Sequence, residues 1–197
     1  SPDIAHPISQ MAAHAKENNW GTKLSAALIG SCTNSSYEDI GRAAFIARQA
    51  LEAGMKMTQQ FIVTPGSEQI KKTIERDGLL KTFNDVGATL MSNACGPCIG
   101  QWKRDDVKSG TANTIVTSFN RNFRARQDDN PETLAFIGSP ELVMALGIAG
   151  RLDFNPISDG LTSPSGKKFK LQPPVADELP KKGFVADPDG YQKPAGK

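Results

Sequence analysis

The sequence predicts an α/β protein, a three-layer α/β/α domain with a mainly parallel sheet, followed by an extended C-terminal segment rich in proline and glycine. Three observations support this prediction. Short apolar or β-branched runs alternate with longer segments in which apolar residues fall three or four apart. Residues that cap helices stand at the ends of those longer segments. The last 42 residues, 156–197, contain seven proline and five glycine residues, which is the composition of a linker.

The first strand and helix are predicted within residues 24–54. Residues 24–31, LSAALIGS, form an apolar run that ends in small residues, as a buried strand does. In the stretch that follows, Ser36 is placed to cap a helix and Gly54 lies just past its end. Strand, turn and helix therefore follow one another in this part of the chain.

The same order repeats further along. Residues 60–64, QFIVT, form the next predicted strand. Ser67 follows a Pro-Gly turn and caps the next predicted helix, which ends before Gly78. The remaining predicted elements are strands at 88–91, 114–118 and 134–137, and helices at 79–86 and 139–150. Strands that alternate with helices predict a parallel sheet covered on both faces.

Length and charge set the domain organisation and exclude some partners. We expect a leading segment at 1–22, one domain at 23–155, and an extended tail or linker at 156–197 with at most a small hairpin around residues 165–166. The net charge is only +2 and basic residues form no block, so neither nucleic acid nor a membrane is an expected partner. The sequence shows no apolar run of membrane-spanning length and no N-terminal signal, so we expect a soluble chain.

The three cysteines are the main candidates for chemistry. Their odd number argues against a disulfide framework and favours ligands, catalysts or buried thiols in a reducing compartment. Cys32, the Cys95/Cys98 pair and the stretch 120–126 each follow a predicted strand. Ligands of parallel sheets collect at the carboxyl ends of strands, so these three loops are expected on one rim.

Several interpretations of the cysteines are open from spacing alone. Cys95-Gly-Pro-Cys98 is the tetrapeptide of thioredoxin-type redox dithiols. A structural zinc site needs four closed ligands, whereas three thiolates suit a [4Fe–4S] cluster ligated at three irons. Cys32 on its own is equally well a small buried hydrophobic residue.

Other polar residues are weaker candidates. The two histidines, His6 and His14, both precede the first strand, so acid/base catalysis by histidine is not expected. The acid pairs at 105–106 and 128–129 are expected in solvated turns, because neighbouring residues rarely chelate a cation together. Arg124 is expected to be a surface charge.

Three long motifs resemble the aconitase family. They are IGSCTNSSYED at 29–39, NACGPCIGQW at 93–102 and TSFNRNFRAR at 117–126. The form ACGPCIGQW resembles the mitochondrial-type branch, and the resemblance extends over essentially the whole chain. It implies that the chain corresponds to the third of four domains with the start of the linker to the fourth. It also implies that 23–155 is the domain that ligates the iron–sulfur cluster.

The resemblance also implies roles for individual residues. Cys32, Cys95 and Cys98 correspond to the ligands of a [4Fe–4S] cluster, and Asn120 lies beside it. Arg121 and Arg126 correspond to residues that hold substrate carboxylates. In the family the catalytic base is a serine of the fourth domain, and the assisting acid and histidine groups lie on the earlier domains. No catalytic residue is therefore expected in this chain. Purified alone in air, the chain is expected to carry no cluster, and it is expected to be inactive even where anaerobic reconstitution restores the colour of the cluster.

The implied enzyme is a hydro-lyase that isomerises citrate to isocitrate through cis-aconitate. The implied partners are these tricarboxylates and the remaining domains of the same polypeptide. One alternative is a homologous hydro-lyase acting on homocitrate or homoaconitate, and another is a stand-alone thiol-redox or metal-binding domain. The implied location is the mitochondrial matrix, with the bacterial cytoplasm as the alternative.

Overall fold

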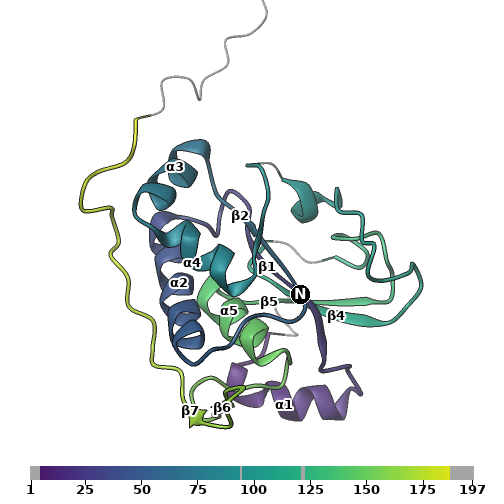
Figure 1. Ribbon diagram of the computed structural model, residues 1–197. Coiled ribbons are helices and arrows are strands. Elements are labelled where there is room, and N and C mark those ends of the chain that lie inside the picture. The colour runs from purple at the N-terminus through teal and green to yellow at the C-terminus, as the bar shows by residue number, and fades with distance from the viewer. Residues whose placement is uncertain (1–4, 94, 121–122, 187–197) are drawn as a thin grey trace, which may run out of the picture.

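The chain folds around a five-stranded parallel sheet with the strand order β3-β2-β1-β4-β5 (Figure 1). The computed structural model describes residues 5–93, 95–120 and 123–186. The strands are β1 (Leu24–Gly30), β2 (Gln60–Thr64), β3 (Thr89–Leu90), β4 (Asn113–Thr117) and β5 (Thr133–Ile137). All five were predicted from the sequence, with bounds that agree within two residues.

Five α-helices and one short 3₁₀ helix accompany the sheet in the described part of the chain. They are α1 (Ile8–Glu17), α2 (Tyr37–Glu52), α3 (Glu68–Arg76), α4 (Leu79–Val86), α5 (Pro140–Ala149) and the 3₁₀ helix η2 (Gly96–Ile99). The four predicted helices, α2 to α5, are confirmed. Helix α1 was not predicted, because Pro7 at its N-cap provides no side-chain hydrogen bond and Ala15 is its one fully buried residue.

Local sequence explains where the longest helix begins. Ser36 accepts a hydrogen bond from the backbone of Asp39, and the Asp39 carboxylate accepts one from the backbone of Ser36. This reciprocal capping box satisfies backbone donors that the first turn otherwise leaves free. Ile40, Ala44 and Ala47 then fall on one face of α2 and are fully buried in the main core.

The sheet has a different cover on each face. Helices α2 to α5 gather on one side of the strands, where they enclose the main core (Figure 1). On the other face, Cys98 and Trp102 pack against Leu28, Ile115 and Phe119 in a second, smaller core. The layer on this second face consists of η2 and irregular chain. The predicted three-layer arrangement around a mainly parallel sheet is confirmed.

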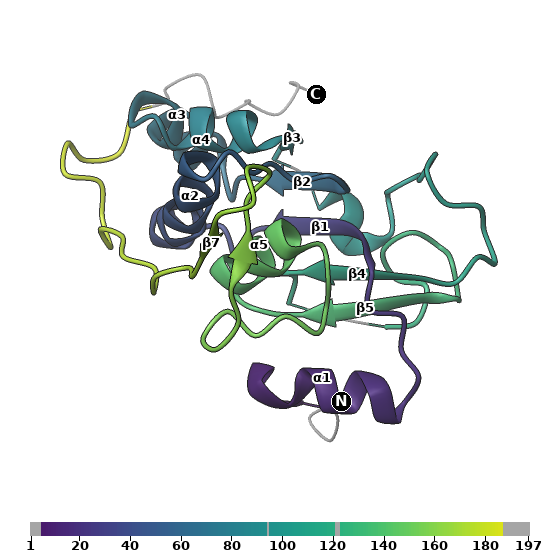
Figure 2. The ribbon, with the colours of Figure 1, turned by 60° about the horizontal axis from the view of Figure 1, so that its bottom comes forward.

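The C-terminal segment is anchored to the helices. The predicted hairpin forms as β6 (Leu161–Thr162) and β7 (Lys168–Phe169). Further on, the backbone N–H of Gln172 donates to Gln49 of α2 and that of Val185 donates to Thr73 of α3, at 2.6 and 3.0 Å. Figures 1 and 2 show this segment, in yellow-green, running along the outside of the helical layer. Among the described residues, no helix is long and apolar enough to cross a membrane.

Candidate functional site

The strand order places the candidate site at the carboxyl ends of β1 and β4. The chain leaves β1 toward β2 on one side, whereas β4 and β5 lie on the other side of β1. Such a reversal is where open α/β sheets bind ligands. Cys32 follows β1 directly, and Asn120 lies three residues after β4.

The loop that carries Cys32 begins where β1 and β2 lie in close contact, and it is hydrogen-bonded to Ser118, the residue that follows β4. Gly30 has a φ of +141°, and a Cβ atom there would lie 2.3 Å from the backbone oxygen of Thr64, so glycine is required where β1 and β2 meet. The Gly30 N–H donates to the Ser118 hydroxyl at 3.0 Å, and the Asn34 side chain donates to the Ser118 carbonyl. Cys32 itself is exposed at the top of this anchored loop.

Cys95 and Cys98 lie at the 3₁₀ helix that covers the second face of the sheet. The Cys98 N–H donates to the Cys95 carbonyl at 2.8 Å, which closes the turn. Cys95 is exposed, whereas Cys98 is 7% exposed within the second core. The Cys98 thiol lies 3.7 Å from Oδ1 of Asn120 and donates to it. The structure therefore brings two of the predicted site residues into contact.

Arg126 is attached to the same turn. Its Nε donates to the Cys98 carbonyl at 2.8 Å, and its guanidinium carbon lies 5.5 Å from the ring centre of Phe123. Gly100 adopts a φ of +84°, and a Cβ atom there would lie 2.8 Å from the backbone oxygen of Arg126. The cysteine turn and the arginine loop are thus in close backbone contact. Arg121, the other predicted substrate-binding residue, lies outside the described residues.

A buried acceptor lies next to the cysteine turn. The Asn93 side chain donates through Nδ2 to Glu68 at the start of α3. Its Oδ1 is buried and has no hydrogen-bond partner among the described residues. A buried oxygen without a donor is rare in folded proteins. Among the described residues, no donor reaches this oxygen, which lies two residues before Cys95.

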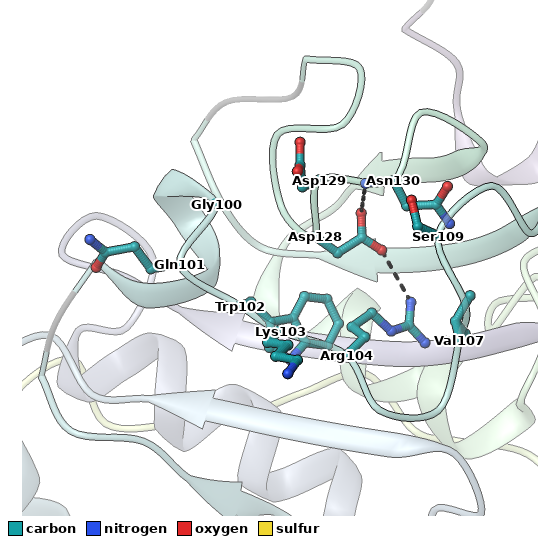
Figure 3. Close-up of a pocket in the computed structure, with 10 residues that line it drawn as sticks. All are labelled: Gly100, Gln101, Trp102, Lys103, Arg104, Val107, Ser109, Asp128, Asp129 and Asn130. Carbon is teal, nitrogen blue, oxygen red and sulfur yellow. Dashed lines mark hydrogen bonds and ion pairs between the residues drawn. The ribbon is translucent and has the colours of Figure 1, made fainter.

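Sequence reasoning missed a network around Arg104, at the opposite, amino-terminal edge of the sheet (Figure 3). Arg104 is 3% exposed and pairs with Asp128, which is 2% exposed. The expectation that the 128–129 pair lies in a solvated turn is therefore wrong for Asp128. Asp106 also pairs with Arg104, and the hydrogen bonds from this guanidinium lower the pKa of the Asp106 carboxyl.

The alternation of residues in the sequence points to this Arg104 network, and the expectation that Arg124 is a surface charge is confirmed. Trp102, Arg104 and Asp106 alternate, so in an extended segment they share one side. Arg124 is 74% exposed and forms a surface ion pair with Glu132, as expected for a surface charge.

Comparison with known proteins agrees with the motifs in these loops. Residues 3–150 match the model of the aconitase family (aconitate hydratase). The mitochondrial aconitate hydratase of Emericella nidulans is 57% identical over 194 residues, and a probable one of Dictyostelium discoideum is 55% identical over 195. The mitochondrial homocitrate dehydratase of Saccharomyces cerevisiae is 55% identical over 193 residues.

These alignments cover 97–99% of this chain but 24–25% of each relative, so the chain spans about a quarter of their length. The family model matches most of the chain, including the loops of all three cysteines. The chain belongs to the aconitase family.

Proposed function

We propose that this chain is the part of an aconitate hydratase that ligates a [4Fe–4S] cluster through Cys32, Cys95 and Cys98. The complete enzyme is a hydro-lyase that interconverts citrate and isocitrate through cis-aconitate. The observation that carries the proposal is the joining of the second and third family motifs at Cys98, which contacts Asn120 through its thiol and Arg126 through its carbonyl.

The donor set fits such a cluster. Among the described residues, no three histidine, cysteine or acidic side chains form a group that could hold a single metal ion. A cluster makes a different demand, because each thiolate ligates a separate iron and the thiols need not converge on one point. Three thiols in loops that follow strands of one parallel sheet suit iron and sulfide better than a hard cation, and three thiolates do not complete the four ligands of a structural zinc site.

When bound, the cluster supplies an iron with an open position, a Lewis acid for the substrate hydroxyl and one carboxylate. Asn120 lies beside the Cys98 sulfur, and we assign it to the cluster side of the site. The Nε of Arg126 is engaged by the Cys98 carbonyl, which leaves its terminal amino groups to bind a substrate carboxylate with two parallel hydrogen bonds. We assign the same task to Arg121. A tricarboxylate needs several such permanently charged partners.

The remaining machinery belongs to the other domains of the same polypeptide. We place the cluster domain at 23–155, after a leading segment at 1–22, and treat 156–197 as the linker to the next domain. The catalytic base is assigned outside this chain, so the chain by itself folds but does not turn over substrate. The relatives are named mitochondrial proteins, and we propose the mitochondrial matrix as the location.

Homocitrate is the second candidate substrate. The aconitate hydratase and the homocitrate dehydratase of Saccharomyces cerevisiae are 54% and 55% identical to this chain. Overall identity therefore does not separate the two activities. The two substrates differ by one methylene group, which a pocket distinguishes by only about 1–3 kcal/mol.

Anaerobic reconstitution with iron and sulfide tests the proposal. We expect the chain to gain the broad visible absorption of a [4Fe–4S] cluster, and we expect citrate or homocitrate to perturb the spectrum of the cluster. The perturbation should weaken in Arg126→Lys and persist in the control Arg124→Lys, because Arg124 is a surface residue. Failure to take up iron, together with a Cys95/Cys98 dithiol potential near that of thioredoxin, would support the redox alternative instead.

A further inference from the structure

We propose that Arg104 is a positioning residue that fixes the Cys95/Cys98 turn relative to Cys32 and Asn120. Its guanidinium lies 4.9 Å from the ring centre of Trp102. Trp102 packs in the same small core as Cys98. The positioning itself is a property of this chain, and its consequence for the cluster rests on the proposed function.

All three guanidinium nitrogens of Arg104 donate hydrogen bonds. Its Nε and Nη2 donate to the two carboxylate oxygens of Asp106 at 3.0 and 2.5 Å. Its Nη1 donates to Oδ1 of Asn113 at 2.8 Å and to Asp128 at 3.5 Å. A planar guanidinium that is buried, paired and stacked in this way has one orientation available.

The partners of Arg104 belong to the rigid start of the sheet. Asn113 begins β4 and accepts a further hydrogen bond from Ser25 of β1 at 2.8 Å. Asp128 accepts one at 2.8 Å from the hydroxyl of Thr133, which begins β5. Three adjacent strands therefore fix the position of the Arg104 guanidinium.

The described parts of two connections lie side by side over the second face of the sheet, where Cys98 and Trp102 of one pack in the same core as Phe119 of the other. The first, residues 91–112, joins β3 to β4 and carries Cys95 and Cys98; the second, residues 118–132, joins β4 to β5 and carries Asn120 and Arg126. Each leads from the carboxyl edge to the amino edge, because the strands are parallel.

These two connections are joined at both edges. At the carboxyl edge, Arg126 and Asn120 contact Cys98, and at the amino edge Arg104 pairs with Asp128 (Figure 3). Trp102 lies between the two junctions along the first connection, so the Arg104 junction fixes where the cysteine turn sits on the sheet.

Three variants separate positioning from simple stability. Arg104→Met removes the positive charge and the planar set of guanidinium donors. It also leaves the buried Asp128 carboxylate without the guanidinium that pairs with it, which destabilises the fold. The double variant Arg104→Met, Asp128→Asn removes that buried charge as well. The free energy of unfolding should therefore recover, while the cation–π contact with Trp102 remains lost. Arg104→Lys keeps the charge without the planar fork. Arg42→Met is the control, because Arg42 forms a 2.8 Å ion pair with Glu141 between α2 and α5, away from the cysteines.

The readout is the alkylation rate of each cysteine under native conditions, measured by mass spectrometry beside thermal unfolding. In the unaltered chain, Cys98 should react more slowly than Cys32 and Cys95, since it is the buried one. Loss of a desolvated cation–π contact should raise the Cys98 rate about tenfold in the double variant, with the Cys32 rate unchanged. Arg104→Lys should fail to restore protection, and Arg42→Met should leave all three rates unchanged.

Unchanged Cys98 protection in the stable double variant would overturn the proposal, as would full protection in Arg104→Lys. Iron uptake after anaerobic reconstitution provides the second readout, which should fall in the double variant and not in Arg42→Met. If the unaltered chain takes up no iron, the proposed function fails while the alkylation rates still decide the role of Arg104.

Discussion

Replacement of Gly100 by alanine should loosen the contact between the cysteine turn and the arginine loop. Gly100 ends η2 with a φ of +84°, and its added Cβ would lie 2.8 Å from the backbone oxygen of Arg126. A matched control exists in the same connection. Gly110 has a φ of +82°, and a Cβ atom there would meet nothing within 4 Å. The two substitutions therefore share the backbone penalty and differ in the contact.

The expected loss of unfolding free energy in each variant follows from this geometry. Placing alanine in the left-handed region costs about 1–2 kcal/mol, partly offset by about 0.4–1 kcal/mol from the reduced freedom of the unfolded chain. Gly110→Ala should therefore lower the free energy of unfolding by about 1 kcal/mol. At Gly100 the overlap adds about 1–3 kcal/mol, because a backbone oxygen cannot rotate away as a flexible side chain could.

Urea and thermal unfolding of both variants provide the assay. For a chain of this length each kcal/mol shifts the melting temperature by about 2–4 °C, so Gly100→Ala should melt well below Gly110→Ala. Alkylation of Cys98 should also accelerate in Gly100→Ala alone. Equal losses of stability in the two variants would refute the claim that the Gly100–Arg126 approach is a tight backbone contact.

Three further predictions concern the capping box, the Arg104 network and the substrate arginines. Ser36→Ala should lower the free energy of unfolding by about 1 kcal/mol through loss of the α2 cap, as measured by urea unfolding. The pKa of Asp106 is lowered from its usual 3.8 by Arg104, so its stabilising effect is present above that value and is lost as the pH falls through the lower, folded-state pKa; Asp106→Asn should flatten the dependence of unfolding free energy on pH in this acidic range. In the complete enzyme, Arg121→Lys or Arg126→Lys should each lower kcat/KM for the tricarboxylate at least tenfold, whereas Arg124→Lys should not; steady-state kinetics with citrate and homocitrate check this.

The parts of the fold predictable from sequence are those whose cause is local. The apolar run before Cys32 predicts β1, and Ser36 and Gly54 mark the two ends of α2. These signals are readable because helix capping and the spacing of apolar residues depend only on residues close together in the sequence. Helix α1 lacks a side-chain cap, and its residues Ile8 and Met11 pack against the main core. Its stability depends on this tertiary contact, so the local sequence only weakly predicts a helix.

The long-range parts of the site were less predictable. Arg104 and Asp128 are 24 residues apart, and their pairing arises because two connections run together across the sheet. From sequence alone, an aspartate beside a second aspartate is typical of a solvated turn. The contact between Cys98 and Asn120 was foreseeable only as two loops expected on one rim, since which side chains touch depends on how the chain crosses the second face.

The most direct test of the central claim is the iron content of the anaerobically reconstituted chain with each cysteine replaced in turn by serine. Mössbauer spectroscopy and iron and sulfide analysis should show one [4Fe–4S] cluster per unaltered chain and loss of that cluster in Cys32→Ser, Cys95→Ser and Cys98→Ser alike. Ser31→Ala, adjacent to Cys32, is the control and should keep the cluster. Full cluster content in any one of the three cysteine variants would show that this cysteine is not a ligand and would contradict the assignment of the site.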